Sequence, residues 1–110
     1  MPRYLVQVGY TPEAWANLLK NPQNRVEAVT PLIRDLGGTV ESAYLAFGEY
    51  DVVVTLNMPD NVSAAAVSMV FSAGGAVKSI KTTPLMTVEE DVEAMRKGGA
   101  AAARYRPPSA

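Results

Sequence analysis

The first residues of the chain alternate between two sets of side chains, a pattern with the period of a β-strand. One face of this run would carry Tyr4, Val6 and Val8, and the other Leu5 and Gln7. β-branched and aromatic residues favour extended structure, and apolar residues on both faces are typical of a strand inside a sheet. The pattern therefore predicts a central strand over residues 3–9.

Two helical segments are predicted after this strand, separated by Pro22. Thr11 and Pro12 supply an N-cap and a proline at the first helical position, so a short helix begins there. Pro22 interrupts it, because the residue before a proline is driven away from helical geometry. A second helix follows, with apolar residues at steps of three and four, namely Val26, Val29, Ile33 and Leu36. Gly37 and Gly38 end it.

Residues 40–47 and 51–57 are predicted to form a hairpin. The first run alternates loosely, and the second is rich in valine. Gly48 and Glu49 lie between them, and a type II′ turn takes glycine at its first central position. We therefore expect a two-residue turn at Gly48 and Glu49.

A third helix is predicted from Pro59 and Asp60 to Gly74. Its inward face is expected to consist of small and medium apolar residues, namely Val62, Ala66, Met69, Val70 and Ala73. Residues 77–83 follow as an edge strand, since lysines and a nearby proline mark a solvent-facing edge.

The end of the chain is predicted to be a capped helix and a tail. Thr87 and Glu90 have the spacing of a capping box, so a helix is expected from there to about Lys97. From Gly98 onward the periodicity is lost, which indicates a mobile tail or one ordered against a partner chain. The chain is thus divided into a domain over residues 1–97 and a tail over residues 98–110.

The β-α-β-β-α-β order predicts an α+β domain of ferredoxin-like plan, with a four-stranded antiparallel sheet. Right-handed crossovers place both main helices on the same face. The other face would be left bare with apolar residues on it, and such a surface usually marks an interaction site. We therefore expect a homo-oligomer, associated through the sheet like a dimeric α/β-barrel. The alternative is a monomer whose last helix and tail fold back over the sheet.

Composition excludes several chemistries. Ten basic and eleven acidic residues give a net charge of −1, which offers no reason to expect a nucleic-acid or membrane partner. The chain has no cysteine and no histidine, so thiolate chemistry, ordinary zinc sites and Ser-His-Asp machinery are ruled out.

No cofactor, metal site or catalytic residue is predicted, and the acidic run Glu89 to Asp91 is interpreted as a helix start. No signal peptide is expected, and the lack of cysteine fits a reducing cytoplasm.

The run from Ala46 to Val54, Ala-Phe-Gly-Glu-Tyr-Asp-Val-Val-Val, is followed by Pro59 and Asp60. It resembles the signature of the GYD-domain family, a group of small bacterial proteins, and the likeness extends over roughly Tyr4 to Asp91. The resemblance implies the same ferredoxin-like or dimeric α/β-barrel plan and assigns no biochemical role. In this chain Glu49 separates the glycine from the tyrosine of the signature.

The candidate site lies at the end of the sheet where this signature falls. We expect Tyr50, Asp51 and Arg25 to converge there, with Trp15 and Tyr44 as apolar walls, in a pocket for a small anionic or polar ligand. The structural alternative is that Asp51 accepts hydrogen bonds from turn amides or pairs with Arg25.

Three functional classes fit these features. The first is a non-catalytic oligomeric module that binds a small ligand or partner at its subunit interface. The second is a small cofactor-independent enzyme, similar to monooxygenases or isomerases of the dimeric α/β-barrel type, and the third is a structural assembly subunit. An RNA-recognition domain has the same element order but needs aromatic rings on its third strand, and residues 51–57 contain none. The absence of histidine favours the binding module.

Overall fold

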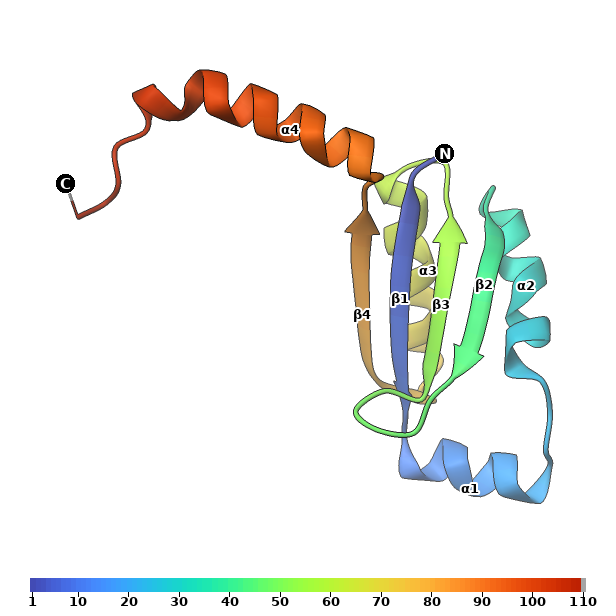
Figure 1. Cartoon of the computed structure of the whole chain (residues 1–110). Helices are drawn as coiled ribbons and strands as arrows, with labels where there is room; N and C mark the ends of the chain where they lie inside the picture. Colours follow the sequence, from blue (N-terminus) through green and yellow to red (C-terminus); the bar gives the residue numbers. More distant parts are fainter. Residues whose placement is uncertain (110) are drawn as a thin grey trace.

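A computed structural model describes residues 1–109 of the chain (Figure 1). The elements follow the predicted order, including the capped helix at the C-terminal end. They are β1 (Arg3–Tyr10), α1 (Pro12–Lys20), α2 (Arg25–Asp35), β2 (Thr39–Leu45), β3 (Val52–Asn57), α3 (Asn61–Ala73), β4 (Val77–Leu85), α4 (Val88–Ala101) and a short 3₁₀ turn, η1 (Ala102–Arg104).

The four strands form one antiparallel sheet in the order β2-β3-β1-β4. The predicted ferredoxin-like α+β fold is confirmed, with β1 in the interior and β4 at an edge. Helices α2 and α3 cover one face of the sheet, α1 lies across the end where β1 finishes, and α4 projects away from the opposite end (Figure 1). None of the helices in residues 1–109 is both long and apolar enough to cross a membrane.

The core lies between the sheet and helices α2 and α3. Alternate residues of β1 and β3 face each other in register, and their buried pairs are Tyr4 with Leu56, Val6 with Val54 and Val8 with Val52. Ile33 of α2 and Val67 of α3 pack against this surface from the helix side. The Tyr4 hydroxyl donates to the side chain of Asn61 at the start of α3, so the buried phenol is satisfied.

The open face of the sheet is more polar than the sequence led us to expect. Arg3 and Glu41 form an ion pair on it at 2.7 Å, and the Asn57 amide donates to the same carboxylate at 3.1 Å. The Ser42 and Thr55 hydroxyls are hydrogen-bonded at 2.6 Å. The strand register leaves Leu5 and Val53 as the apolar residues of β1 and β3 on this side. Tyr44 of β2 lies opposite Val53 and Leu85 of β4 lies opposite Arg3, so this face carries apolar side chains mixed with polar ones.

Helix α3 is rotated relative to the prediction. Its buried residues are Ala64 and Val67, whereas Val62 is 79% exposed and Met69 69% exposed. Val70, also predicted to face inward, is 46% exposed. The prediction was wrong because α3 contains no charged residue, so no polar face marked the side that belongs in solvent.

The connection between β2 and β3 also differs from the predicted two-residue turn. The Ala46 amide donates to the Asp51 carbonyl at 2.8 Å, which leaves residues 47–50 as the loop. Positive φ angles occur at Gly37 and Gly75, and Gly48 is not among these residues. The type II′ geometry at Gly48 and Glu49 is therefore wrong. Asp51 is held in the sheet because its own amide donates to the Val8 carbonyl at 2.8 Å.

Helix α4 begins as predicted and continues further. The Thr87 hydroxyl accepts from the Glu90 amide at 3.1 Å, and the Glu90 carboxylate accepts from the Thr87 amide at 3.0 Å. The hydrogen bond from the Thr87 amide to the carboxylate lowers the pKa of Glu90. The helix passes the expected end at Lys97 and runs to Ala101, because alanine, the strongest helix former, follows the two glycines.

Gly38 provides a test of this backbone arrangement. A methyl group at Gly38 would lie 2.7 Å from the Asn57 carbonyl oxygen and would also meet buried Met58. We expect Gly38→Ala to destabilise the fold by about 1–3 kcal/mol in urea unfolding, the usual cost of overpacking. Gly48→Ala is the matched control, because nothing lies within 4 Å of its added methyl; its effect should stay within about 0.5 kcal/mol. If Gly48→Ala lowered the free energy of unfolding strongly, the turn at Gly48 would depend on glycine after all.

Candidate functional site

Asp51 is the most connected side chain of the predicted site. Its carboxylate oxygen Oδ2 accepts from the Tyr10 amide at 2.9 Å and from the Trp15 indole Nε1 at 3.3 Å. The carboxylate thus joins the loop before β3 to the end of β1 and to helix α1. The predicted alternative of bonding to turn amides is close to this, although the amide belongs to β1.

Arg25 does not form the expected ion pair with Asp51. Its Nη1 donates to the Gln23 side chain at 3.2 Å, and within residues 1–109 no carboxylate oxygen lies within 4.0 Å of its guanidinium. Arg25 begins helix α2 behind the Asn24 N-cap, whose side chain accepts from the Glu27 amide at 3.0 Å. The helix start therefore fixes the backbone of Arg25 and leaves its charged group available.

Tyr10 lies in the candidate site although the sequence pattern did not predict it there. Its ring contacts Trp15 edge to face, with centroids 5.6 Å apart and planes at 89°. Burial raises the pKa of the Tyr10 phenol, the Arg25 charge opposes that rise, and the Asp51 charge adds to it. The phenol is thus neutral at physiological pH and able to donate a hydrogen bond. An aromatic residue directly before the Thr11 N-cap was the available signal, but the predicted strand ended at Gly9.

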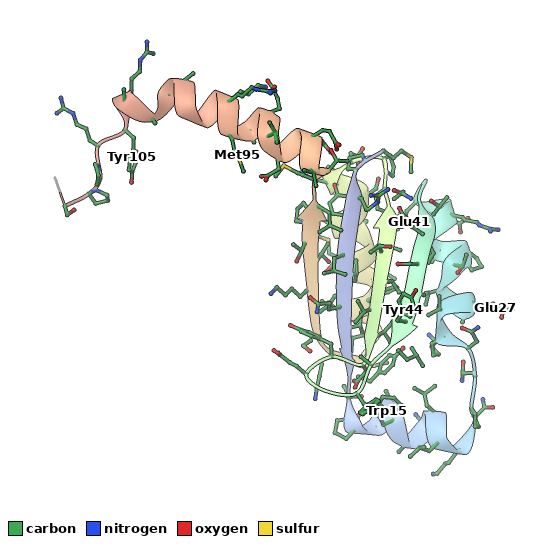
Figure 2. The ribbon with its side chains drawn as sticks, in the orientation of Figure 1. Trp15, Glu27, Glu41, Tyr44, Met95 and Tyr105 are labelled. Atoms are coloured by element: carbon green, nitrogen blue, oxygen red, sulfur yellow. The ribbon has the colours of Figure 1, made fainter. Side chains whose placement is uncertain are left out.

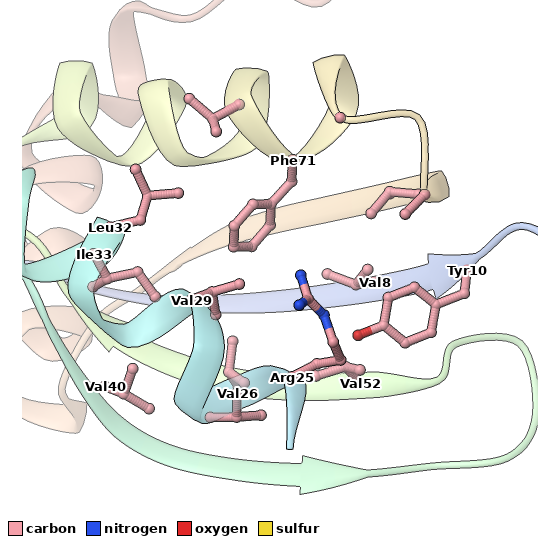
Figure 3. Close-up of a pocket in the computed structure, with 15 residues that line it drawn as sticks. Val8, Tyr10, Arg25, Val26, Val29, Leu32, Ile33, Val40, Val52 and Phe71 are labelled. Carbon is pink, nitrogen blue, oxygen red and sulfur yellow. The ribbon is translucent and has the colours of Figure 1, made fainter. Parts of the chain in front are cut away.

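An apolar cavity of about 270 Å³ opens between α2, α3 and the covered face of the sheet. Its walls are mainly aliphatic, with Phe71 as an aromatic contribution from α3. The guanidinium of Arg25 and the hydroxyl of Tyr10 lie near each other among these apolar side chains (Figure 3). The other labelled residues of the wall come from α2 and the sheet, and they are Val8, Val26, Val29, Leu32, Ile33, Val40 and Val52.

A second, more open hollow of about 620 Å³ lies on the other side of Arg25 and Tyr10. Both residues line the two spaces and, with Val26, form the wall between them. The outer hollow also brings together four of the five predicted site residues: Trp15, Arg25, Tyr44 and Asp51. Figure 2 shows Trp15 on α1 below the end of β2, where Tyr44 lies.

Tyr50 does not join the other four predicted residues. It lines a different depression, of about 360 Å³, together with Gly48, Glu49 and Gln7. Lys81 of β4 also lines this depression. The expected convergence of Tyr50 with Asp51 and Arg25 does not occur, because Asp51 is bonded towards β1 and α1 while its neighbour Tyr50 is still part of the loop.

The arrangement is suited to holding an anion rather than a metal ion. Within residues 1–109 no group of three or more acidic side chains is placed to hold a metal. The polar groups at the wall, a guanidinium and a neutral phenol, both donate hydrogen bonds. Tyr10 is half-buried and Arg25 is exposed, so the phenol is the donor whose contact to an anionic group is strengthened by reduced competition from water.

The raised pKa of Tyr10 has a consequence at alkaline pH. Below pH about 10 the phenol is neutral in both the folded and unfolded chains. Above it, the unfolded chain ionises first, so the free energy of unfolding falls as pH rises towards the folded-state pKa. We expect urea unfolding between pH 9 and 11 to show a smaller stability loss for Tyr10→Phe than for wild type. Tyr105→Phe, which removes an exposed tyrosine, serves as the control; equal losses in all three proteins would contradict the burial of Tyr10.

Comparison with known proteins places the chain in a family. A solved structure described as the crystal structure of FFRP-DM1 aligns with 78% of this chain and 100% of its own, at 15% identity and a TM-score of 0.49. A likeness of this size says nothing about activity. Among curated proteins no match is found. The GYD domain profile matches residues 4–95, most of the chain, so the protein belongs to the GYD domain family.

Proposed function

We propose that this GYD-domain protein is a non-catalytic, self-associating module that binds a small ligand with an apolar body and an anionic group. The observation that carries the proposal is the Arg25 guanidinium beside an apolar cavity, with the Tyr10 hydroxyl next to it (Figure 3). The apolar part of the ligand would occupy the space between α2 and α3. Its anionic group would meet Arg25 and Tyr10.

The charge of Arg25 supports an anionic ligand. The described part of the chain offers this guanidinium a neutral partner, Gln23, and no carboxylate within 4.0 Å. A guanidinium matches a carboxylate through two parallel hydrogen bonds, which gives both energy and orientation. An aliphatic or aromatic monocarboxylate has the required combination of one flat anionic group and an apolar body.

The size of the cavity limits the ligand to a small molecule. Its volume of about 270 Å³ is slightly below the roughly 300–1,000 Å³ found for small-molecule pockets. The raised pKa of Tyr10 favours a phenol that donates a hydrogen bond over one that abstracts a proton at neutral pH. These properties favour binding over the alternative of a cofactor-independent enzyme. If the wild-type protein converted a substrate and an Arg25 variant did not, the enzyme would be favoured instead.

Calorimetric titration with hexanoate and benzoate tests the proposal, with hexanol and benzamide as neutral analogues. We expect the carboxylates to bind and Arg25→Gln to weaken them by about 10- to 100-fold, since hydrogen bonds to charged groups are worth about 1.5–3 kcal/mol. Arg34→Gln is the matched control, because it removes a charge from the other end of the same helix. Equal binding of the neutral analogues, or no effect of Arg25→Gln, would refute the anionic ligand.

Filling the cavity gives an independent test of where the ligand lies. Val29 lines the apolar space from α2, and Val29→Phe would occupy part of its volume. We expect this variant to keep its fold by circular dichroism and to lose carboxylate binding. Leu19→Phe is the control, since Leu19 is 77% exposed on α1 and is not among the residues lining this space. Undiminished binding by Val29→Phe would place the ligand elsewhere.

A further inference from the structure

Two apolar helix surfaces face solvent in this chain. The first, the outer stripe of α3, lies opposite the buried Ala64 and Val67 and consists of Val62, Ala65, Ala66, Met69 and Ala73. The second, the stripe of α4 and η1, follows steps of three and four and consists of Val88, Val92, Met95, Gly99 and Ala102. We infer that the α4 stripe of one copy of this chain packs on the outer stripe of α3 in a second copy.

Helix α4 needs a neighbour to be stable. It projects from the domain (Figure 1), and all its residues are exposed, with Val88 at 76% and Met95 at 64%. A compact chain of this length has a radius of gyration of about 13 Å, whereas this one has 17.7 Å. Isolated helices of fewer than about 12–15 residues are marginal in water, and each glycine costs about 1 kcal/mol relative to alanine. Gly98 and Gly99 lie within this 14-residue helix.

The outer stripe of α3 is a suitable packing surface for such a helix. Helix α3 has no charged residue along its 13 positions, and its polar residues, Asn61, Ser63, Ser68 and Ser72, lie outside the outer stripe. Three of the five stripe residues are alanines, so a second helix could approach closely. The two helices are matched in length, about 21 Å for α4 and about 20 Å for α3.

The positions of the charged residues favour α3, rather than the open face of the sheet, as the surface on which α4 packs. Covering the sheet would bury the Arg3–Glu41 ion pair and bring Lys81 out of water, and such burial costs free energy that the pair does not fully return. Contact between the two stripes buries no charged group of α3. On α4, Glu90 and Lys97 lie on the side opposite the stripe, whereas Asp91 and Arg96 border it, where charged side chains can stay in water at the rim of the contact.

A second copy also explains why both stripes occur in one chain. A two-fold axis would place the α4 of each copy on the α3 of the other, so one symmetry operation covers all four surfaces. This arrangement depends on the self-association part of the proposed function. Ligand binding at Arg25 uses other residues and is tested separately.

Cysteine cross-linking tests the contact, because the natural chain has no cysteine. Met69 and Met95 lie near the middle of their helices and are 69% and 64% exposed, so both can be replaced with little effect on folding. We expect the double variant Met69→Cys/Met95→Cys to give a disulfide-linked dimer on a non-reducing gel. A mixture of the two single variants should give the same product. Met69→Cys/Lys97→Cys, with the second cysteine on the opposite face of α4, is the control and should stay uncross-linked.

Other cross-linking results would overturn the inference. An intramolecular disulfide in the double variant would mean that α4 folds back on its own α3. Efficient dimers from Met69→Cys alone, or from Met95→Cys alone, would mean that identical helices pair. In either case the contact between α4 and the α3 of a second copy is wrong.

Light scattering provides a readout that does not depend on disulfide geometry. The wild-type protein should have twice the mass of the chain, and Met69→Glu or Val92→Glu should each raise the concentration needed for dimerisation at least 10-fold. Glu93→Ala, on the polar face of α4, should leave it unchanged. A monomeric wild type would refute self-association as a whole. A dimer that neither stripe variant weakens would refute this contact alone.

Discussion

The hydrogen bonds of Asp51 join the ends of three strands to helix α1. Its amide donates to Val8 of β1, its carbonyl accepts from Ala46 beyond β2, and its carboxylate accepts from the Tyr10 amide and the Trp15 indole. Because these contacts come from one residue, they fix several elements relative to one another. The position of Tyr10, and with it the wall between the two hollows, depends on this junction. The family signature therefore has a structural task whether or not a ligand touches it.

The features predicted from the sequence are those that short-range chemistry determines. Thr11 and Thr87 cap their helices because hydroxyl acceptors at these positions satisfy free amides a few residues on. The alternation in β1 separated Tyr4, Val6 and Val8, which are buried, from Leu5 and Gln7 on the other face, since β-structure has a period of two residues. The α+β fold follows from these local patterns and from the handedness of the crossovers.

The features missed depend on contacts between distant residues. The orientation of α3 could not be determined from its own residues, because an uncharged helix has no polar side to compare with the apolar one. Tyr50 was grouped with Asp51 on the basis of adjacency, yet the two line different depressions. Tyr10 entered the site through the folding of α2 against the sheet, which brings Arg25 near it from 15 positions along the chain. The four predicted residues that do meet all lie near the same end of the sheet.

The edge-to-face contact between Tyr10 and Trp15 has an optical consequence. Trp15 is the one tryptophan of the chain, and its indole N–H is bonded to the Asp51 carboxylate. The indole emission of this protein therefore arises at the border of the outer hollow and not from an average over several environments. A shift in its wavelength reports on the hydration and hydrogen bonding of this one corner of the molecule, without any added label.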